Sequence, residues 1–191
     1  MLSAYYGTTE FAEFLLQNKA DANVRDDRQN TPLHLASLHG HVQVVKLLLE
    51  SGADPNLKNQ GGDTPLHLSK SEEICELLLA EQANVNSKNN EGRTPLHHAA
   101  SHQGGKERVK LLLNKGAEVN AVDGLGQSPL FRAVFVQDKE NVELLIAHGA
   151  DVNLKNNEGR TPLDLLTKTI PPPRTVSGVP VPSPDNSYPL T

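Results

Sequence analysis

The chain has 191 residues and a mass of 20.7 kDa, which fits one domain or a domain with a tail. Hydrophobic residues make up 37% of the chain, enough to bury a core, and the net charge of −5 argues against nucleic acid or an anionic membrane surface as partner. No apolar run approaches the roughly 20 residues that a membrane-spanning helix needs, the first residues show no secretion signal, and the single cysteine excludes an intramolecular disulfide.

Two motifs recur along the chain in a fixed phase. The first is Thr-Pro-Leu-His, which is followed by two altered copies; the five copies begin at Thr31, Thr64, Thr94, Ser128 and Thr161, in steps of 33, 30, 34 and 33 residues. The second is an apolar run that ends near Gly-Ala-Asp and Asn, with copies at residues 14–23, 47–56, 77–86, 111–120 and 144–153. Such periods are typical of solenoids, in which each unit buries its apolar side against its neighbours.

These motifs resemble the ankyrin repeat family over about residues 2–170. The resemblance implies an all-α fold: an ankyrin-repeat solenoid of stacked helix-turn-helix units joined by β-hairpin loops. In chain order we expect an ankyrin repeat domain over 1–170 and a Pro-rich tail over 171–191. The domain is expected to divide into a partial repeat, four full repeats and a second partial repeat, at residues 1–25, 26–58, 59–88, 89–122, 123–155 and 156–170.

The first partial repeat begins inside a helix, because residues 2–7 align with residues 35–40. Two interpretations of this end stay open. The chain is a piece of a longer solenoid, or it carries an improvised cap made of Tyr5, Tyr6, Phe11 and Phe14.

The repeat at 26–58 shows why these residues form the unit. Thr31 suits the helix N-cap and Pro32 the first helical position, where its missing N–H costs nothing. Gly40 ends the first helix, residues 44–49 supply the apolar stripe of a second, and Gly52 suits a left-handed C-cap.

The repeat at 59–88 departs from this pattern. It lacks the counterparts of residues 38–40, so we expect a shortened first helix, a rebuilt turn and the weakest repeat of the array. Lys19 and Gln82 occupy the Gly52 position and are expected to be left-handed, at a cost of roughly 1–2 kcal/mol each. The step of 34 places an extra residue near 103–105.

The tail holds seven of the 13 prolines and no apolar periodicity, which predicts disorder or polyproline II helix. Its Pro-Pro-Pro-Arg and Pro-Val-Pro-Ser-Pro segments could dock into a polyproline-reading module, although a solvated tail is the simpler interpretation.

Side chains for catalysis or metal binding are scarce. His34, His67 and His97 recur with the repeat and are expected to bond the backbone; His98 and His102 are the one spaced pair, with no evident third ligand. Cys75 falls in an apolar stripe and is expected to be a buried thiol. Without nucleophile-elbow or phosphate-loop motifs, we expect no enzyme, no cofactor and no metal site.

The resemblance places partner-facing residues at the loop tips and on the first helices, around a concave groove. Carried over to this chain, the candidates are Arg28, Leu38, His39, Lys70, Arg93, His102, Leu125, Phe135, Val136 and Arg160. Phe135, Arg93 and Arg160 are the expected anchors, since aromatic and Arg side chains dominate interface energetics. Phe135 alternatively folds back onto its own repeat.

We therefore expect a monomeric, cytoplasmic, non-catalytic scaffold that binds another protein, without nucleic-acid binding or membrane insertion. The alternative is a targeting module or fragment of a larger ankyrin-containing protein, such as a bacterial effector acting in a host cell. A further family-based possibility is hydroxylation of the loop asparagines, for which backbone bonding is the simpler role: Asn23, Asn56, Asn86, Asn120 and Asn153.

Overall fold

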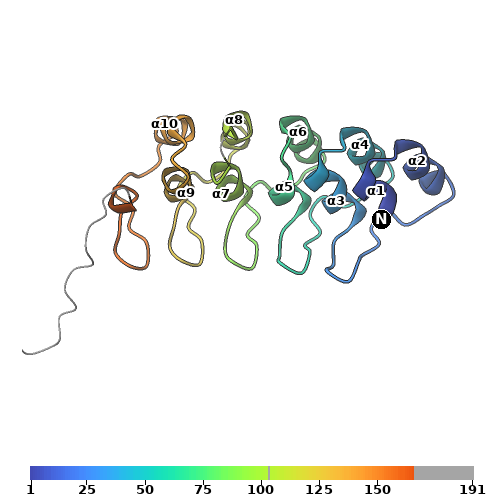
Figure 1. Cartoon of the computed structure of the whole chain (residues 1–191), viewed down its shortest axis with the longest axis horizontal. Coiled ribbons are helices and arrows are strands. Elements are labelled where there is room, and N and C mark those ends of the chain that lie inside the picture. The colour runs from blue at the N-terminus through green and yellow to red at the C-terminus, as the bar shows by residue number, and fades with distance from the viewer. Residues whose placement is uncertain (103, 166–191) are drawn as a thin grey trace, which may run out of the picture.

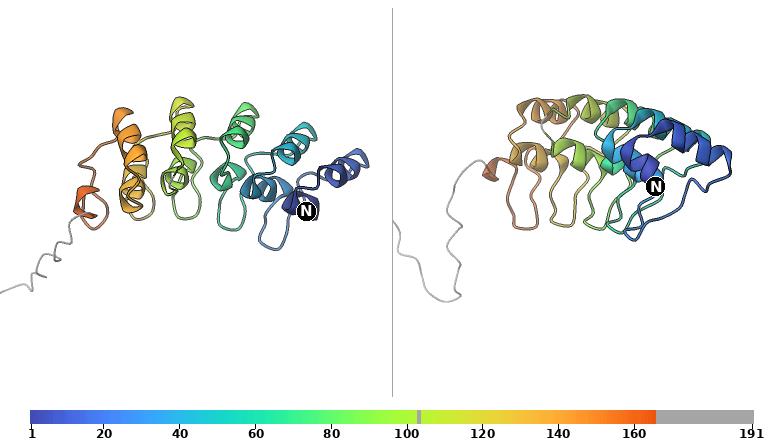
Figure 2. Two further views of the ribbon diagram at one scale, coloured as in Figure 1. Left: turned by 45° about the horizontal axis from the view of Figure 1, so that its top comes forward. Right: turned by 45° about the vertical axis from the view of Figure 1, so that its right-hand side comes forward.

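The computed structural model of the chain describes residues 1–102 and 104–165. Ten α-helices and one short 3₁₀-helix lie within these residues: α1 (Leu2–Tyr6), α2 (Thr9–Gln17), α3 (Pro32–His39), α4 (Val42–Glu50), α5 (Pro65–Leu68), α6 (Glu72–Ala80), α7 (Pro95–Ala100), α8 (Lys106–Asn114), α9 (Pro129–Phe135), α10 (Lys139–Ala147) and η1 (Leu163–Leu165). The odd-numbered helices form one row, the even-numbered helices a second, and the loop tips project beyond the first row (Figures 1 and 2). The solenoid predicted from the repeats is confirmed.

Helices α3, α5 and α7 begin with the same cap. In α3 the Thr31 hydroxyl accepts a bond from the His34 backbone N–H (3.4 Å), and the His34 ring Nδ1 accepts one from the Thr31 N–H (3.1 Å). Pro32 occupies the first helical position, and Gly40 ends the helix with φ of 79°. Histidine thus takes the role that Glu or Gln has in a common capping box.

The same histidine joins each repeat to the next. Because Nδ1 accepts the threonine N–H, the proton is on Nε2, which donates to a carbonyl of the following tip. His34 bonds Asp63 O at 2.9 Å, His67 bonds Arg93 O at 3.1 Å, and His97 bonds Gln127 O at 3.0 Å. In α9 the position is taken by Phe131, which is fully buried.

Loop asparagines form a second series of links between repeats. The Asn56 side chain donates to Gln82 O (3.1 Å) and accepts from Asn84 N–H (2.8 Å). Asn23, Asn86 and Asn120 bridge to the following repeat in the same way. The backbone-bonding role expected for these four asparagines is therefore present.

The loop tips are stacked turns. Each tip is closed by two backbone bonds, such as Asn59 N–H to Asp63 O and Gly62 N–H to Asn59 O, each at 2.9 Å. A further backbone bond joins neighbouring tips, such as Gly124 N–H to Glu91 O at 2.8 Å. No strand is assigned within residues 1–102 and 104–165, so the β-hairpin detail of the prediction is not confirmed.

The shortened repeat is confirmed. Helix α5 has four residues and ends at Ser69 in extended backbone, where α3 continues to His39. Arg108 of α8 reaches into this break and donates from Nη1 to Ser69 O at 2.8 Å. Cys75, buried as expected, lies beside the break with its thiol 3.4 Å from the Ser69 hydroxyl.

Within residues 1–102 and 104–165, four residues other than glycine adopt left-handed backbone. Lys19 (φ 64°) and Gln82 (φ 62°) do so as predicted. Gln29 (φ 61°) and Gln137 (φ 57°) were not predicted, and they stand where other repeats have a tip glycine or the glycine that ends the first helix. The repeat geometry therefore overrides the local preference of the residue.

The core runs along the interface between the two helix rows. Its centre is the leucine that follows each Thr-Pro or Ser-Pro, buried in every full repeat: Leu33, Leu66, Leu96 and Leu130. The aromatic residues proposed as an improvised cap are exposed, and Tyr5 packs edge-on against His39. The Pro-rich tail expected over residues 171–191 lies outside the described residues.

Candidate functional site

The predicted partner-facing residues occupy two neighbouring parts of the repeat. Arg28, Arg93, Leu125 and Arg160 lie in the tips. The others lie at the end of a first helix or just after it: Leu38, His39, Lys70, His102, Phe135 and Val136. The tips and first helices lie together on one side of the molecule (Figure 1), so the structure brings these residues to one extended surface, which we call the tip surface.

The most prominent apolar group of the tip surface is Phe135, which is 72% exposed. It does not fold back onto its own repeat. Leu125 at the tip of the same repeat is 57% exposed, whereas Leu38 and Val136 are half-buried. Exposed apolar side chains on a tip and on the adjoining helix end provide contact area for an apolar partner group.

A buried carboxylate organises the arginines of this region. Asp123 Oδ1 accepts hydrogen bonds from the backbone N–H groups of Leu125 and Gln127, each at 2.9 Å. Asp123 Oδ2 forms an ion pair with Arg132 at 2.5 Å. The Arg93 Nε lies 3.7 Å from Asp123 Oδ2, the oxygen that Arg132 contacts, and the Arg93 side chain also pairs with Glu91. Burial acts to raise the pKa of Asp123, but the bonds from Arg132 and the tip backbone outweigh it and lower the pKa.

These pairs define what the arginines can do. The Arg93 side chain is only 30% exposed, so it lies against the surface with its charge compensated. Arg160 is more open, with a 3.3 Å pair to Glu158. The role of both residues as anchors stays a prediction, and Arg93 is better suited to a flat contact than to reaching into a partner.

A second polar cluster lies between the second and third tips. Asn89 donates to Asp63 Oδ1 at 2.7 Å, and His98 Nε2 lies 3.8 Å from the same oxygen. Burial lowers the pKa of His98, although Asp63 acts in the opposite direction. His98 packs edge-on against His67, with ring centroids 5.4 Å apart. This cluster is a structural junction between tips.

His98 and His102 do not converge on one point. The His102 Nδ1 donates to the His98 carbonyl at 2.8 Å, so His102 is used in ending its own helix. Within the described ranges, no group of three His, Cys, Asp or Glu side chains is placed to hold a metal ion. Burial raises the pKa of the Cys75 thiol, which keeps it protonated and weakly reactive.

The remaining candidates are surface residues with local contacts. Arg28 and Lys70 are exposed. His39 stacks edge-on against Tyr5, with ring centroids 4.5 Å apart, which extends the aromatic part of the surface to the first repeat.

Sequence reasoning missed the Asp123 cluster. One signal was available: each tip has Asp or Asn at the same position, namely Asp26, Asn59, Asn89, Asp123 and Asn156. An aligned Asp in this series indicates a carboxylate with backbone donors and room for a cation. The approach of Arg93 depends on the repeat-to-repeat distance, which the motif alone does not contain.

The comparisons with known proteins agree with this geometry. A family model described as ankyrin repeats (3 copies) matches residues 1–59, 51–123 and 104–168. The chain belongs to the ankyrin repeat family. Ankyrin repeats are in general protein–protein interaction modules. Comparison with curated proteins finds no match. Across the part of the chain that the structure describes, every helix is too short or too polar to cross a bilayer.

Proposed function

We propose that the protein is a non-catalytic scaffold that binds another protein through the tip surface. The observation that carries the proposal is the exposure of Phe135 and Leu125 beside a fixed framework of paired charges. Exposed aromatic residues next to rigid polar groups are typical of the anchors that dominate binding energy.

The rigidity of the surface supports the same function. Tip-to-tip backbone bonds and the histidine and asparagine links hold the tips in place before any partner arrives. A surface that is already ordered loses little conformational entropy on docking, so more of the contact energy appears as affinity. A partner that offers an apolar side chain to Phe135 and Leu125 fits this arrangement.

The paired arginines favour specificity over charge attraction. Arg93 and Arg132 are compensated by Asp123 and Glu91, so the surface has no strong field of one sign. The proposal also places the protein in the cytoplasm, with its single thiol, Cys75, reduced.

A quantitative pull-down tests the proposal. The bait is the full chain, either unchanged or carrying Phe135→Ala with Leu125→Ala. We expect the proteins captured by the unchanged chain to bind the double variant at least tenfold more weakly, about 1.4 kcal/mol or more. The matched control is Ile146→Ala on α10, which removes an apolar side chain that is 46% exposed away from the tip surface.

The outcome is decided by the difference between the two variants. Loss of the same proteins with the Phe135 and Leu125 variant alone supports the tip surface. Equal capture by all three baits, or loss with Ile146→Ala alone, contradicts it. An Arg93→Ala variant then measures how much the charge framework contributes.

A further inference from the structure

The third residue of each even-numbered helix lies between neighbouring repeats, and α8 places an arginine there. The position is held by Phe11 in α2, Val44 in α4, Ile74 in α6, Arg108 in α8 and Asn141 in α10. Val44, Ile74 and Asn141 are at most 1% exposed, whereas Arg108 is half-buried. A charged side chain is rare at such a position unless another charge is paired with it.

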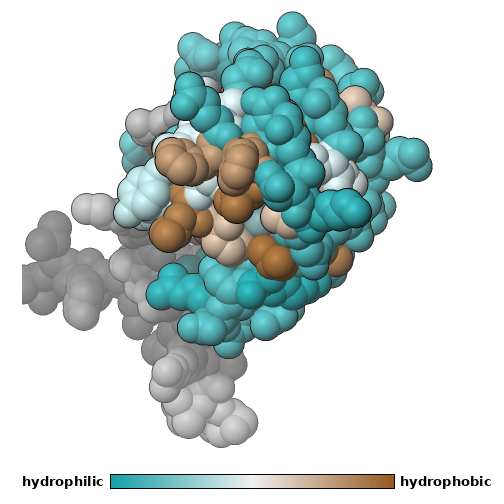
Figure 3. Space-filling view, turned by 90° about the vertical axis from the view of Figure 1, so that its right-hand side faces the viewer, coloured by the Kyte–Doolittle hydropathy of each residue, from teal (hydrophilic) through white to brown (hydrophobic). Residues whose placement is uncertain are grey.

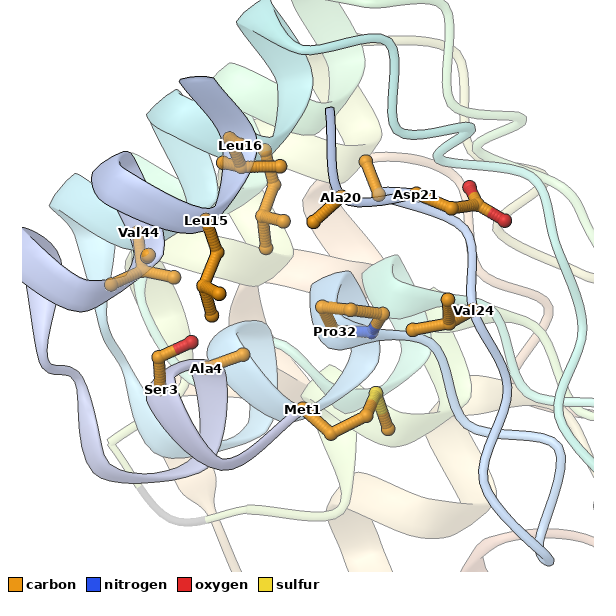
Figure 4. Close-up of a pocket in the computed structure, with 13 residues that line it drawn as sticks. Met1, Ser3, Ala4, Leu15, Leu16, Ala20, Asp21, Val24, Pro32 and Val44 are labelled. Carbon is orange, nitrogen blue, oxygen red and sulfur yellow. The ribbon is translucent and has the colours of Figure 1, made fainter. Parts of the chain in front are cut away.

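The surroundings of Val44 show how apolar this position is in another repeat. Val44 lines a cavity of about 120 Å³ together with Leu15 and Leu16 of α2 (Figure 4). The α1–α2 end of the array, where Phe11 holds the position, presents a patch of apolar side chains surrounded by polar residues (Figure 3). Packing between repeats therefore does not explain an arginine in this series.

Arg108 reaches into the break after α5, where it uses part of its hydrogen-bonding capacity. Its Nη1 donates to Ser69 O at 2.8 Å, and its Nη2 lies so near Gly105 that a Cβ there would be 3.2 Å away. Nε of Arg93 and Nε of Arg132 are buried without a hydrogen-bond partner, whereas no nitrogen of Arg108 is. Since a guanidinium has five N–H donors, the remaining donors of Arg108 are open to a group from outside the chain.

The charge of Arg108 has no carboxylate partner among the described residues. Arg93, Arg132 and Arg160 each pair with an Asp or a Glu, but no carboxylate lies within ion-pair distance of Arg108. Burial lowers the pKa of Arg108, yet an arginine stays charged at neutral pH. Lys70 is exposed beside the break and adds a second positive charge.

The break belongs to the tip surface. Ser69 and Lys70 follow the end of α5, as His102 follows α7 and Val136 follows α9. Helix α5 packs on α7 and α7 packs on α9, so these helix ends succeed one another along one side of the array (Figure 1). Because α5 has four residues where α3 has eight, the row of first helices is interrupted where Arg108 bonds Ser69.

We propose that the Arg108 guanidinium binds a carboxylate side chain of the protein partner at the break after α5. This rests on the proposed function and adds the chemistry of one group that the partner presents. A guanidinium and a carboxylate match through two parallel N–H···O bonds, which are stronger where water is partly excluded. Phosphoryl groups are recognised by clusters of arginines, whereas the break combines one half-buried guanidinium with Lys70.

Selection of random peptides displayed on phage, with the full chain as target, tests the proposal. We expect the bound peptides to share an Asp or Glu at a fixed distance from a large apolar residue. A synthetic copy of such a peptide should bind the unchanged chain about tenfold or more weakly when its acid is replaced by Asn or Gln.

The same replacement in the peptide should make little difference to binding by Arg108→Gln, which removes the charge but keeps an N–H donor. Lys110→Gln is the matched control, because it removes a charge from an exposed position of the same helix, and it should behave like the unchanged chain.

The outcomes separate this proposal from the proposed function. Peptides that require Phe135 but share no acid, or whose acid matters equally to the unchanged chain and to Arg108→Gln, overturn the carboxylate site and leave the tip surface standing. A shared acid that requires Arg108, in peptides that bind Phe135→Ala as well as the unchanged chain, supports the carboxylate site and contradicts the role of Phe135. The absence of any bound peptide overturns both.

A measurement on the unchanged protein keeps the test valid if Arg108→Gln fails to fold. The Arg108 Nε–H resonance is followed by NMR while the acidic peptide, or its Asn or Gln counterpart, is added. We expect a saturable shift with the acidic peptide alone. A resonance that does not move, or that moves equally with both peptides, contradicts the proposal.

Discussion

The histidine at the third position of α3, α5 and α7 serves two neighbours at once. Its Nδ1 accepts the threonine N–H of its own cap, and its Nε2 donates to the next tip. Only the neutral ring with the proton on Nε2 satisfies both. Burial lowers the pKa of His67 and His97 to about 4, and that of His34 in the same direction.

Stability should therefore fall as the medium is acidified. In the unfolded chain these rings take up protons near their ordinary pKa of about 6.5, while in the folded chain they resist until about pH 4. Their contribution is complete above pH 6.5 and is lost as the pH falls through this window. His67 and His97 together account for several kcal/mol at most.

Urea unfolding at a series of pH values measures this loss. His97→Gln keeps an N3 side chain that can complete a capping box but removes the titration, so its pH dependence should be shallower. A midpoint independent of pH between 6.5 and 4 would show that the rings are not buried in the neutral form.

Tip glycines face a different constraint from the glycines that end the second helices. Gly92 has φ of 74°, and a Cβ there would lie 2.9 Å from Gly124 N, whose N–H bonds Glu91 O. Gly116 has φ of 86°, but a Cβ there meets nothing within 4 Å.

Alanine substitutions at Gly116 and Gly92 should distinguish the cost of left-handed backbone from the cost of a steric clash with the neighbouring tip. Gly116→Ala should lower the free energy of unfolding by about 1–2 kcal/mol, the strain of left-handed backbone alone. Gly92→Ala should lower it by about 1 kcal/mol more, because the neighbouring tip must shift and weaken its hydrogen bond. Denaturant titration of both variants gives the difference, and equal losses would mean that the tips do not support each other.

At this scale the sequence was sufficient for the threonine caps and for the left-handed Lys19 and Gln82, because those follow from comparing one copy of a motif with another, whereas the left-handed Gln29 and Gln137 were missed. Thr31, Pro32 and Lys19 could be assigned from one repeat compared with another. The approach of Arg93 to Asp123 could not, since it depends on how side chains from adjacent repeats meet.

Among the elements, α5 is the exception. It has a single turn, and its repeat obtains part of its support from the next one through Arg108 and Ser69. A helix this short has little stability of its own, because nucleation fixes several residues for few hydrogen bonds. The missing residues predicted the short helix, but not that an arginine from α8 would bond the broken end.

Hydrogen exchange should identify residues 64–86 as the least protected repeat among the full ones. Arg108→Ala should increase exchange there further and lower the free energy of unfolding by about 1–3 kcal/mol, since the Ser69 carbonyl loses its charged donor. Lys110→Ala, at an exposed position of the same helix, is the control. If residues 64–86 prove the best protected segment, the repeat is not weak.

For the whole molecule, regular spacing made the fold predictable almost throughout. Five copies of two motifs define the order, orientation and stacking of the helices, since each unit needs its neighbours to bury its core. The proposed binding surface was harder to predict from the sequence. The tip and helix-end positions followed from the family, and exposure settled how Phe135 and Arg93 differ.

The links contributed by His34 and Asn56 run from one repeat to the next, whereas Phe135 and Leu125 are exposed to solvent. Cohesion between repeats and the proposed recognition of a partner therefore use separate sets of side chains. Residues that select a ligand can be exchanged one tip at a time while the spine is retained, which makes this chain a suitable starting point for directed changes of binding preference.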